Sequence, residues 1–224
     1  MGGGWAEGSG DFNRTTNNMN FWGAGLYGGW TRGAFGLSAD VHFTSSFNSL
    51  KQELPSAMRM ADLEADITAR ALSAGIRAEY RLRAGNVTVI PHAGVRYTNL
   101  TVDGYDADSG GTVLEGDGFS QDLVFFPAGI ALEMPLETES GWRFLPRADF
   151  AVVPAAGDIR AREDVRWTGL GKSYSVSTQD MDQVSYTAQA GIGCGKDNFS
   201  VSVNYALQAG FTTEGHSLFA ELRW

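Results

Sequence analysis

The feature that most restricts the fold of this chain is a long alternation of apolar with small or polar residues, repeated in nine segments. In the last segment, every second residue is apolar: Leu218, Ala220, Leu222 and Trp224. Side chains on a β-strand point to alternate faces, so each segment has one apolar and one polar face. We predict an all-β, antiparallel protein with about nine strands. The segments are residues 20–30, 34–44, 68–82, 87–98, 122–137, 142–154, 184–194, 200–211 and 216–224.

The length of these segments indicates a membrane protein. They run to about ten residues or more, whereas strands of globular proteins average about five or six. A tilted strand needs ~9–11 residues to cross a bilayer. Aromatic residues such as Trp22, Trp30, Phe35, Tyr97 and Trp224 lie toward segment ends on the apolar face, as in the girdles of membrane barrels. We predict a transmembrane β-barrel, with a soluble β-protein as the alternative.

The opposite face of the segments carries charged residues, which we expect to face a water-filled lumen. They can form an ion network that stiffens the wall, or line a polar conduit. Asp40 and His42 could form an acid–base pair, but no nucleophile accompanies them, so we expect a hydrogen bond and no enzymatic activity. The predicted lumen-facing residues are Asp40, His42, Arg77, Glu79, Arg81, Arg96, Arg143, Arg147, Asp149, Glu221 and Arg223.

Composition excludes several classes of protein. The net charge of −9 argues against nucleic acid as a partner, because phosphate contacts need clustered Lys and Arg. The sequence contains no run of ~18 apolar residues, so no transmembrane helix is predicted. The start of the chain has no signal-peptide pattern, so an export signal would lie on sequence outside this chain. Cys194 is the one cysteine, which excludes an intrachain disulfide. We expect no metal site and no cofactor.

The connections alternate between short and long, which predicts an orientation. Short links at 31–33, 83–86, 138–141 and 195–198 contain the Gly, Asn or Asp residues that tight hairpins require. The connections at 45–67, 99–120 and 155–183 are longer. Membrane barrels have short periplasmic turns and longer external loops, so we expect Trp224 at the periplasmic end.

A meander of nine strands cannot readily close into a barrel. The two edge strands of a nine-stranded meander cannot pair antiparallel, and an open edge in hydrocarbon leaves backbone groups unsatisfied. Bacterial single-chain barrels have an even number of strands. We therefore expect residues 1–18 to be a loop or N-terminal remnant and residues 19–224 to form the barrel. The chain would be a fragment, a truncated reading frame or part of a longer protein.

Three stretches resemble the C-terminal β-barrel (translocator) domain of bacterial autotransporters: residues 25–30, 90–97 and 218–224. The resemblance covers about residues 19–224 and implies roughly the last nine of the family's twelve strands. It implies an outer-membrane barrel of Gram-negative bacteria that anchors or exports an N-terminal passenger by type V secretion. The family's first three strands, pore helix and passenger would be absent from this sequence. The implied partners are that passenger in cis, outer-membrane lipid and the barrel assembly machinery. That machinery would recognise a terminal signal formed by Leu218, Ala220, Leu222 and Trp224.

An outer-membrane adhesin or enzyme that acts through its external loops is the alternative function. Acidic residues in the long connections would be its candidates for contact with a cation or ligand. A solvated acidic loop is the simpler interpretation of the same residues. These candidates are Asp103, Asp106, Asp108, Asp117 and Asp122.

Overall fold

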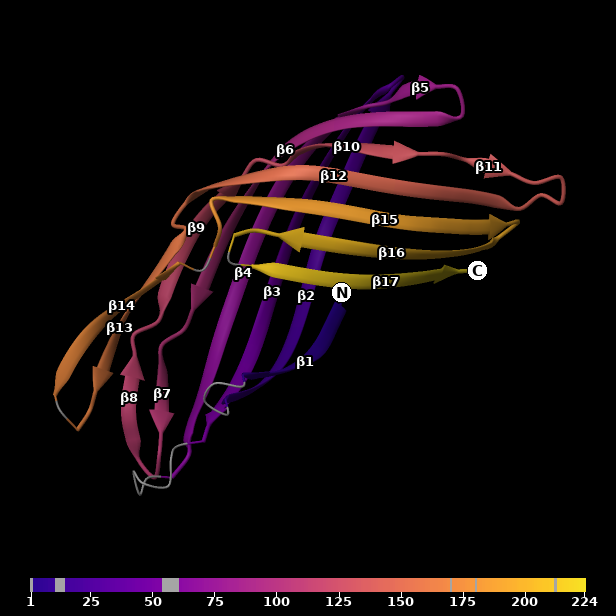
Figure 1. The fold of residues 1–224 in the computed structure, drawn as a ribbon. Coiled ribbons are helices and arrows are strands. Elements are labelled where there is room, and N and C mark those ends of the chain that lie inside the picture. The colour runs from indigo at the N-terminus through magenta and orange to yellow at the C-terminus, as the bar shows by residue number, and fades with distance from the viewer. Residues whose placement is uncertain (1, 11–14, 54–60, 170, 180, 212) are drawn as a thin grey trace.

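The computed structural model describes residues 2–10, 15–53, 61–169, 171–179, 181–211 and 213–224. The regular structure in these ranges is β-strand, and the strands form one antiparallel sheet that curls on itself (Figure 1). No helix in the described ranges is long and apolar enough to cross a membrane. The predicted all-β, antiparallel fold class is confirmed.

The wall of the barrel is a meander in which each strand pairs with the next one along the chain. Two of its members are interrupted: β5 continues β4, and β10 and β11 continue β9. The breaks in the second member fall near Pro127 and Pro135, which have no N–H for the ladder. The wall consists of β1 (Gly2–Gly10), β2 (Thr15–Arg32), β3 (Phe35–Gln52), β4 (Leu63–Tyr80), β5 (Leu82–Ala84), β6 (Val87–Val102), β9 (Phe119–Phe125), β10 (Ala128–Glu133), β11 (Leu136–Glu137), β12 (Arg143–Gly157), β15 (Val184–Lys196), β16 (Phe199–Ala209) and β17 (Glu214–Arg223).

β1 corrects the prediction that residues 1–18 are a loop. It pairs antiparallel with β2, from Gly2 opposite Gly23 to Gly10 opposite Thr15. Within the described ranges the wall therefore has ten strands rather than nine, an even number. Five of the nine residues of β1 are glycine, so no alternation of side chains was there to reveal it. The division into domains at residue 19 stays a prediction.

The long connections also differ from the prediction, because much of them is strand. β2, β3 and β4 each run for 18 residues, past the predicted segments. Two hairpins fill the later connections: β7 (Tyr105–Asp108) with β8 (Thr112–Gly116), and β13 (Arg160–Trp167) with β14 (Lys172–Gln179). We call residues 15–20, 46–52, 63–70, 105–116, 160–169 and 171–179 the distal extension; in Figure 1 its hairpins project from one end of the wall.

Tight turns join the wall strands at the opposite end, as predicted. Gly33 between β2 and β3 and Gly85 between β5 and β6 have φ of 63° and 62°. Asp197 between β15 and β16 has φ of 53°. This left-handed region is open to glycine and tolerated by Asp, which explains these residue types at the turns.

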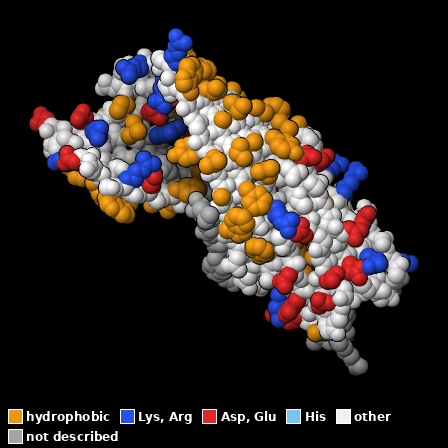
Figure 2. Space-filling view, turned by 180° about the vertical axis from the view of Figure 1, so that it is seen from behind, with side chains coloured by type: hydrophobic (Ala, Val, Ile, Leu, Met, Phe, Trp, Pro, Cys, Tyr) orange, Lys and Arg blue, Asp and Glu red, His pale blue; other side chains and the backbone are white. Residues whose placement is uncertain are grey.

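The two faces of the wall differ in chemistry. Large apolar side chains are exposed on what we call the outer face, as at Leu26 (83%) and Ile130 (53%). Figure 2 shows hydrophobic side chains in a band over the wall, with charged side chains gathered toward the ends of the molecule. The opposite, inner face buries His92 together with two apolar residues, Ile90 and Leu123. The burial pattern is therefore the reverse of a soluble protein, in which the apolar face would be covered.

Candidate functional site

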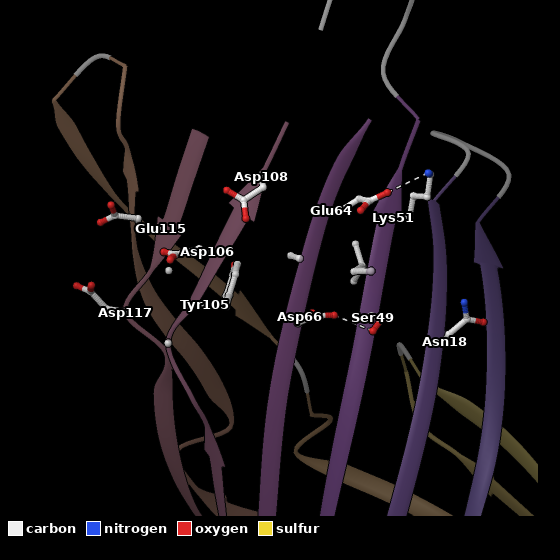
Figure 3. Close-up of a pocket in the computed structure, with 14 residues that line it drawn as sticks. Asn18, Ser49, Lys51, Glu64, Asp66, Tyr105, Asp106, Asp108, Glu115 and Asp117 are labelled. Atoms are coloured by element: carbon white, nitrogen blue, oxygen red, sulfur yellow. Dashed lines mark hydrogen bonds and ion pairs between the residues drawn. The ribbon is translucent and has the colours of Figure 1, made fainter. Parts of the chain in front are cut away.

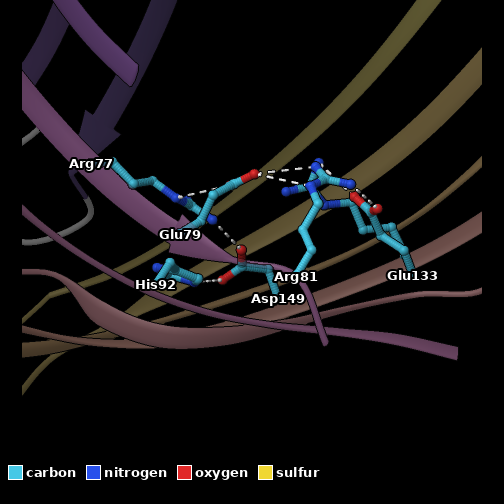
Figure 4. Close-up of polar contacts among 7 residues, drawn as sticks. Arg77, Glu79, Arg81, His92, Glu133 and Asp149 are labelled. Atoms are coloured by element: carbon cyan, nitrogen blue, oxygen red, sulfur yellow. Dashed lines mark hydrogen bonds and ion pairs between the residues drawn. The ribbon is translucent and has the colours of Figure 1, made fainter. Parts of the chain in front are cut away.

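The inner face carries a charged network that connects strands not adjacent in the sheet (Figure 4). Arg77 Nη2 on β4 lies 3.3 Å from Asp149 Oδ2 on β12, although β6 and β10 separate these strands. His92 Nε2 on β6 lies 3.1 Å from Asp149 Oδ1. A flat sheet would hold β4 and β12 about 14 Å apart, since neighbouring strands are spaced about 4.8 Å. The contact therefore requires a strongly curved wall with the network on its concave side.

The network continues from Arg77 toward the end with the tight turns. Arg81 lies 3.2 Å from both Glu79 and Glu133, and Arg147 lies 3.7 Å from Glu133. The carboxylates of Glu79 and Glu133 are 24% and 12% exposed, whereas the two arginines are 44% and 46% exposed. The acids therefore lie against the wall and the arginines reach over them. Charge-assisted contacts of this kind hold facing strands in fixed relative positions.

A second group lies nearer the distal extension. Arg96 Nη2 on β6 lies 2.8 Å from Asp40 Oδ1 on β3, and His42 Nδ1 lies 3.3 Å from Asp40 Oδ2. Gly75 on β4 stands between them, and a Cβ at that position would lie 3.0 Å from Arg96 Nη2. The glycine thus leaves space for the arginine to cross β4. Asp40 and His42 are joined to a guanidinium, an arrangement that fits the expected polar contact rather than acid–base catalysis.

The remaining predicted lumen residues lie at the end with the tight turns. Glu221 and Arg223 on β17 pair at 2.8 Å, and both are more than half exposed. Arg143 on β12 shares with them a hollow of about 290 Å³, whose lining includes Ser200 and Ser202. The eleven predicted residues thus fall into three groups, and the contacts add His92 and Glu133. Glu133 was visible in the sequence as the polar partner of Leu132 and Met134 in the same alternation.

The acidic residues of the long connections do not form one cluster. Asp103 pairs with Arg70 at 2.7 Å, and Asp122 accepts hydrogen bonds from the hydroxyl of Tyr97 (2.5 Å) and the amide of Asn99 (2.9 Å). The other three, Asp106, Asp108 and Asp117, line a cavity of about 930 Å³ in the distal extension (Figure 3).

Residues of β2, β3, β4 and the β7–β8 hairpin complete the lining of that cavity. Glu64, Asp66 and Glu115 add carboxylates that no sequence pattern marks as part of a site. Lys51 lies 3.0 Å from Glu64, and hydrogen bonds to Glu64 and Asp62 raise the pKa of the lysine above its ordinary value. Lys51 thus supplies a positive charge in a cavity that is otherwise acidic.

The C-terminal strand is an exposed edge. Within the described ranges β17 pairs only with β16, and β1 only with β2. Leu218, Leu222 and Trp224 are 73%, 54% and 89% exposed, and Ala220 is exposed on the same strand. The residues predicted to form an assembly signal therefore lie along one accessible edge.

Comparison with known proteins agrees with this geometry. The translocator domain of autotransporter NalP from Neisseria meningitidis has the same fold, with a TM-score of 0.70 at 15% identity over 99% of this chain and 72% of that one. Comparison with curated protein sequences gave no match. The model of the family described as "Autotransporter beta-domain" matches residues 1–206, including β1. Since that match covers most of the sequence, the chain belongs to the autotransporter β-domain family.

Proposed function

We propose that this chain is the outer-membrane translocator of an autotransporter, which anchors and helps to export a passenger carried on the same polypeptide. Membership of the family implies the outer membrane of Gram-negative bacteria and a passenger in cis. The observation that carries the proposal is the inverted wall, with exposed apolar side chains on its outer face and buried and charged ones on its inner face. Strand pairing within the sheet satisfies the backbone groups of the inner wall strands, as hydrocarbon requires, while the outward edges of β1 and β17 have no partner strand within the described ranges.

The outer face is proposed to contact lipid. Its exposed residues run along the wall strands, for example Leu37 and Val41 on β3, and Leu72 and Ile76 on β4. In water a continuous exposed apolar surface of this kind would be an aggregation site. Lipid removes that cost, because hydrocarbon is as apolar as these side chains.

The inner face is proposed to line a polar lumen for which the charged groups form the wall. Arg77, Arg81, Arg96 and Arg147 are all at least 35% exposed there, so their guanidinium groups remain partly accessible to water. The carboxylates beside them keep the lining electrically mixed. No reaction is assigned to these residues, and their proposed role is to hold the wall and keep its inside wet.

The terminal residues of β17 are proposed to be recognised by the barrel assembly machinery during insertion. The apolar face of the strand, from Leu218 to Trp224, is accessible in the folded chain. W224E should therefore lower the amount of chain recovered in the outer-membrane fraction several-fold. The measurement is quantitative immunoblotting of fractionated cells, with heat-modifiable gel migration to report folding.

The matched control is F219E, on the other face of the same strand, where the side chain is 60% exposed. It introduces the same charge and should leave recovery close to that of the unaltered chain. Unchanged insertion of W224E would contradict the assembly role. Recovery of the unaltered chain only from the cytosol, folded and monomeric, would contradict the membrane proposal as a whole.

A further inference from the structure

The outer face changes chemistry where β9 leaves the apolar band. Phe126, Val124, Asp122 and Ser120 alternate onto this face, so two apolar residues are followed by two polar ones. Ser120 is four residues beyond Val124, about 13 Å along a strand and about 10 Å along the normal of the membrane at the tilt typical of barrels. This level corresponds to the headgroup region outside the hydrocarbon.

A small pocket lies at this level. Its volume is about 480 Å³, and Ser120, Asp158, Arg160 and Arg162 line it together with Gly157 and Ile159. Arg160 and Arg162 are exposed, whereas Ala161 between them is 4% exposed. The two arginines therefore extend from the same, accessible side of β13. Their shared pocket with Ser120 places that side on the outer face.

These two arginines differ from the other arginines around them. Arg70 is paired with Asp103, and Arg166 on the same strand is paired with Glu115. Across the described residues, neither Arg160 nor Arg162 forms an ion pair or a side-chain hydrogen bond. Two guanidinium groups that share a pocket with one carboxylate, that of Asp158, keep a net positive charge, and an anion would offset it because like charges repel.

The carboxylates nearest to this pocket already have partners. Asp158 Oδ2 accepts a hydrogen bond from the backbone N–H of Asp122 at 3.2 Å. The Asp122 carboxylate is held by Tyr97 and Asn99. Backbone contacts also fix the floor, since Asp158 N donates to Asp122 O at 2.8 Å and Gln121 Nε2 donates to Asp158 O at 2.7 Å. The pocket is thus preformed, and its free donors are the two arginines.

We propose that Arg160 and Arg162 bind a phosphate group of a lipid headgroup in the outer leaflet. Guanidinium groups present paired N–H donors that match phosphate oxygens, and the Ser120 hydroxyl adds a third donor. The flexible stems of the arginines let their heads follow the headgroup level while the stems cover apolar surface. The partner is a phosphorylated glycolipid or phospholipid, and its acyl chains lie against Val124 and Phe126. This inference rests on the membrane placement proposed above.

The test uses the full chain extracted from the outer membrane in detergent. Lipid retained by the protein is measured by native mass spectrometry with three probes: bisphosphorylated lipid A, enzymatically dephosphorylated lipid A, and inorganic phosphate. We expect retention of the phosphorylated lipid to fall about tenfold in R160Q/R162Q, a loss of the size expected for a pair of charge-assisted contacts. R160K/R162K should lie between the two, since lysine keeps the charge without the planar fork.

The matched control is R32Q/R83Q, which removes two exposed arginines at the opposite end of the wall and should retain lipid as the unaltered chain does. Equal retention in R160Q/R162Q and the unaltered chain would overturn the proposal, as would equal retention of dephosphorylated lipid. Binding of inorganic phosphate as tight as that of the lipid would overturn the assignment to a headgroup. Recovery of each variant in the outer-membrane fraction is measured first, so failure of membrane insertion is scored separately.

Discussion

The wall and the distal extension share β2, β3 and β4, but these strands meet different surroundings in the two regions. Along β4 the outer face passes from Ile76, Ala74 and Leu72 to Arg70, Thr68 and Asp66 without a break in pairing with β3. The backbone is equally regular on both sides of this change. The apolar alternation therefore reports what the strand faces, and the hydrogen-bond ladder extends beyond it.

The largest expected effect comes from placing a charge on each side of this boundary. Ile76 and Phe47 are 53% and 51% exposed on outer faces of β4 and β3, one within the apolar band and one in the distal extension. I76R should lower the free energy of unfolding from vesicles by about 2–4 kcal/mol, because hydrocarbon cannot solvate the guanidinium. F47R should cost at most about 1 kcal/mol, since water or headgroups reach it. Tryptophan fluorescence during urea unfolding measures both.

These two variants are each other's control, because they begin from apolar side chains of similar exposure and end in the same residue. Equal costs would mean that the apolar band extends to Phe47 or that the wall does not lie in lipid. Recovery of I76R in the outer membrane at an unchanged unfolding midpoint would contradict the boundary between the apolar band and the distal extension.

A smaller difference separates the ion pairs of the two regions. Asp149 faces Arg77 and the buried His92, whose side chain is 3% exposed. Among the described residues, the Asp103 carboxylate pairs with Arg70 alone, and these side chains are 35% and 52% exposed. D149A should therefore cost roughly 1–3 kcal/mol, because it leaves inner-face donors without an acceptor. D103A should cost less than about 1 kcal/mol although its pair is shorter, at 2.7 Å against 3.3 Å.

The same unfolding measurement distinguishes these variants. If D103A cost as much as D149A, distance rather than surroundings would decide the strength of these pairs. D149N is the companion variant, since it keeps the shape and an acceptor oxygen while it removes the charge. A cost for D149N much smaller than for D149A would assign the effect to lost hydrogen bonds.

The same contrast explains what the sequence could and could not predict. In the apolar band, period-two alternation located nine strands, and glycine and Asp197 located their tight turns. β1 was missed because glycine leaves no pattern, and β13 was missed because its sequence does not alternate apolar with polar residues. Without apolar alternation, a strand such as β13 resembles a polar loop.

The contacts of the site were less predictable than its faces. Alternation placed Arg77 and Asp149 on polar faces, but they lie 72 residues apart and meet because the wall curves. Their contact depends on strand tilt and on the order of β4, β6, β10 and β12, which single segments do not encode. The role of Gly75, which leaves space for Arg96 to reach Asp40, likewise becomes clear only when the residues on the two neighbouring strands are known.

The smallest expected effect is a dependence on pH of the stability of the β13–β14 hairpin in the distal extension, separate from that of the wall. Glu163 on β13 is half-buried, and its Oε1 has no hydrogen-bond partner among the described residues. Burial raises the pKa of this carboxyl above its ordinary value of 4.5. The Asp117 carboxylate acts in the same direction, and the neighbouring Gly118 and Tyr105 lower the pKa by less than burial raises it. The proton is therefore held more tightly in the folded hairpin than in an unfolded one.

This contribution to stability is fully present below the ordinary pKa and is lost as the pH rises through the raised one. Amide exchange of β13–β14, normalised to intrinsic rates, should show weaker protection at neutral pH than below pH 4.5. E163Q keeps the group neutral, so its hairpin should stay protected across this range, while β15–β16 serves as the internal reference in both chains. Weaker protection in E163Q than in the unaltered chain at neutral pH would contradict the assignment, because it would make the ionised carboxylate a stabilising contact. A parallel change in β15–β16 would show instead that the extension and the wall unfold as one unit.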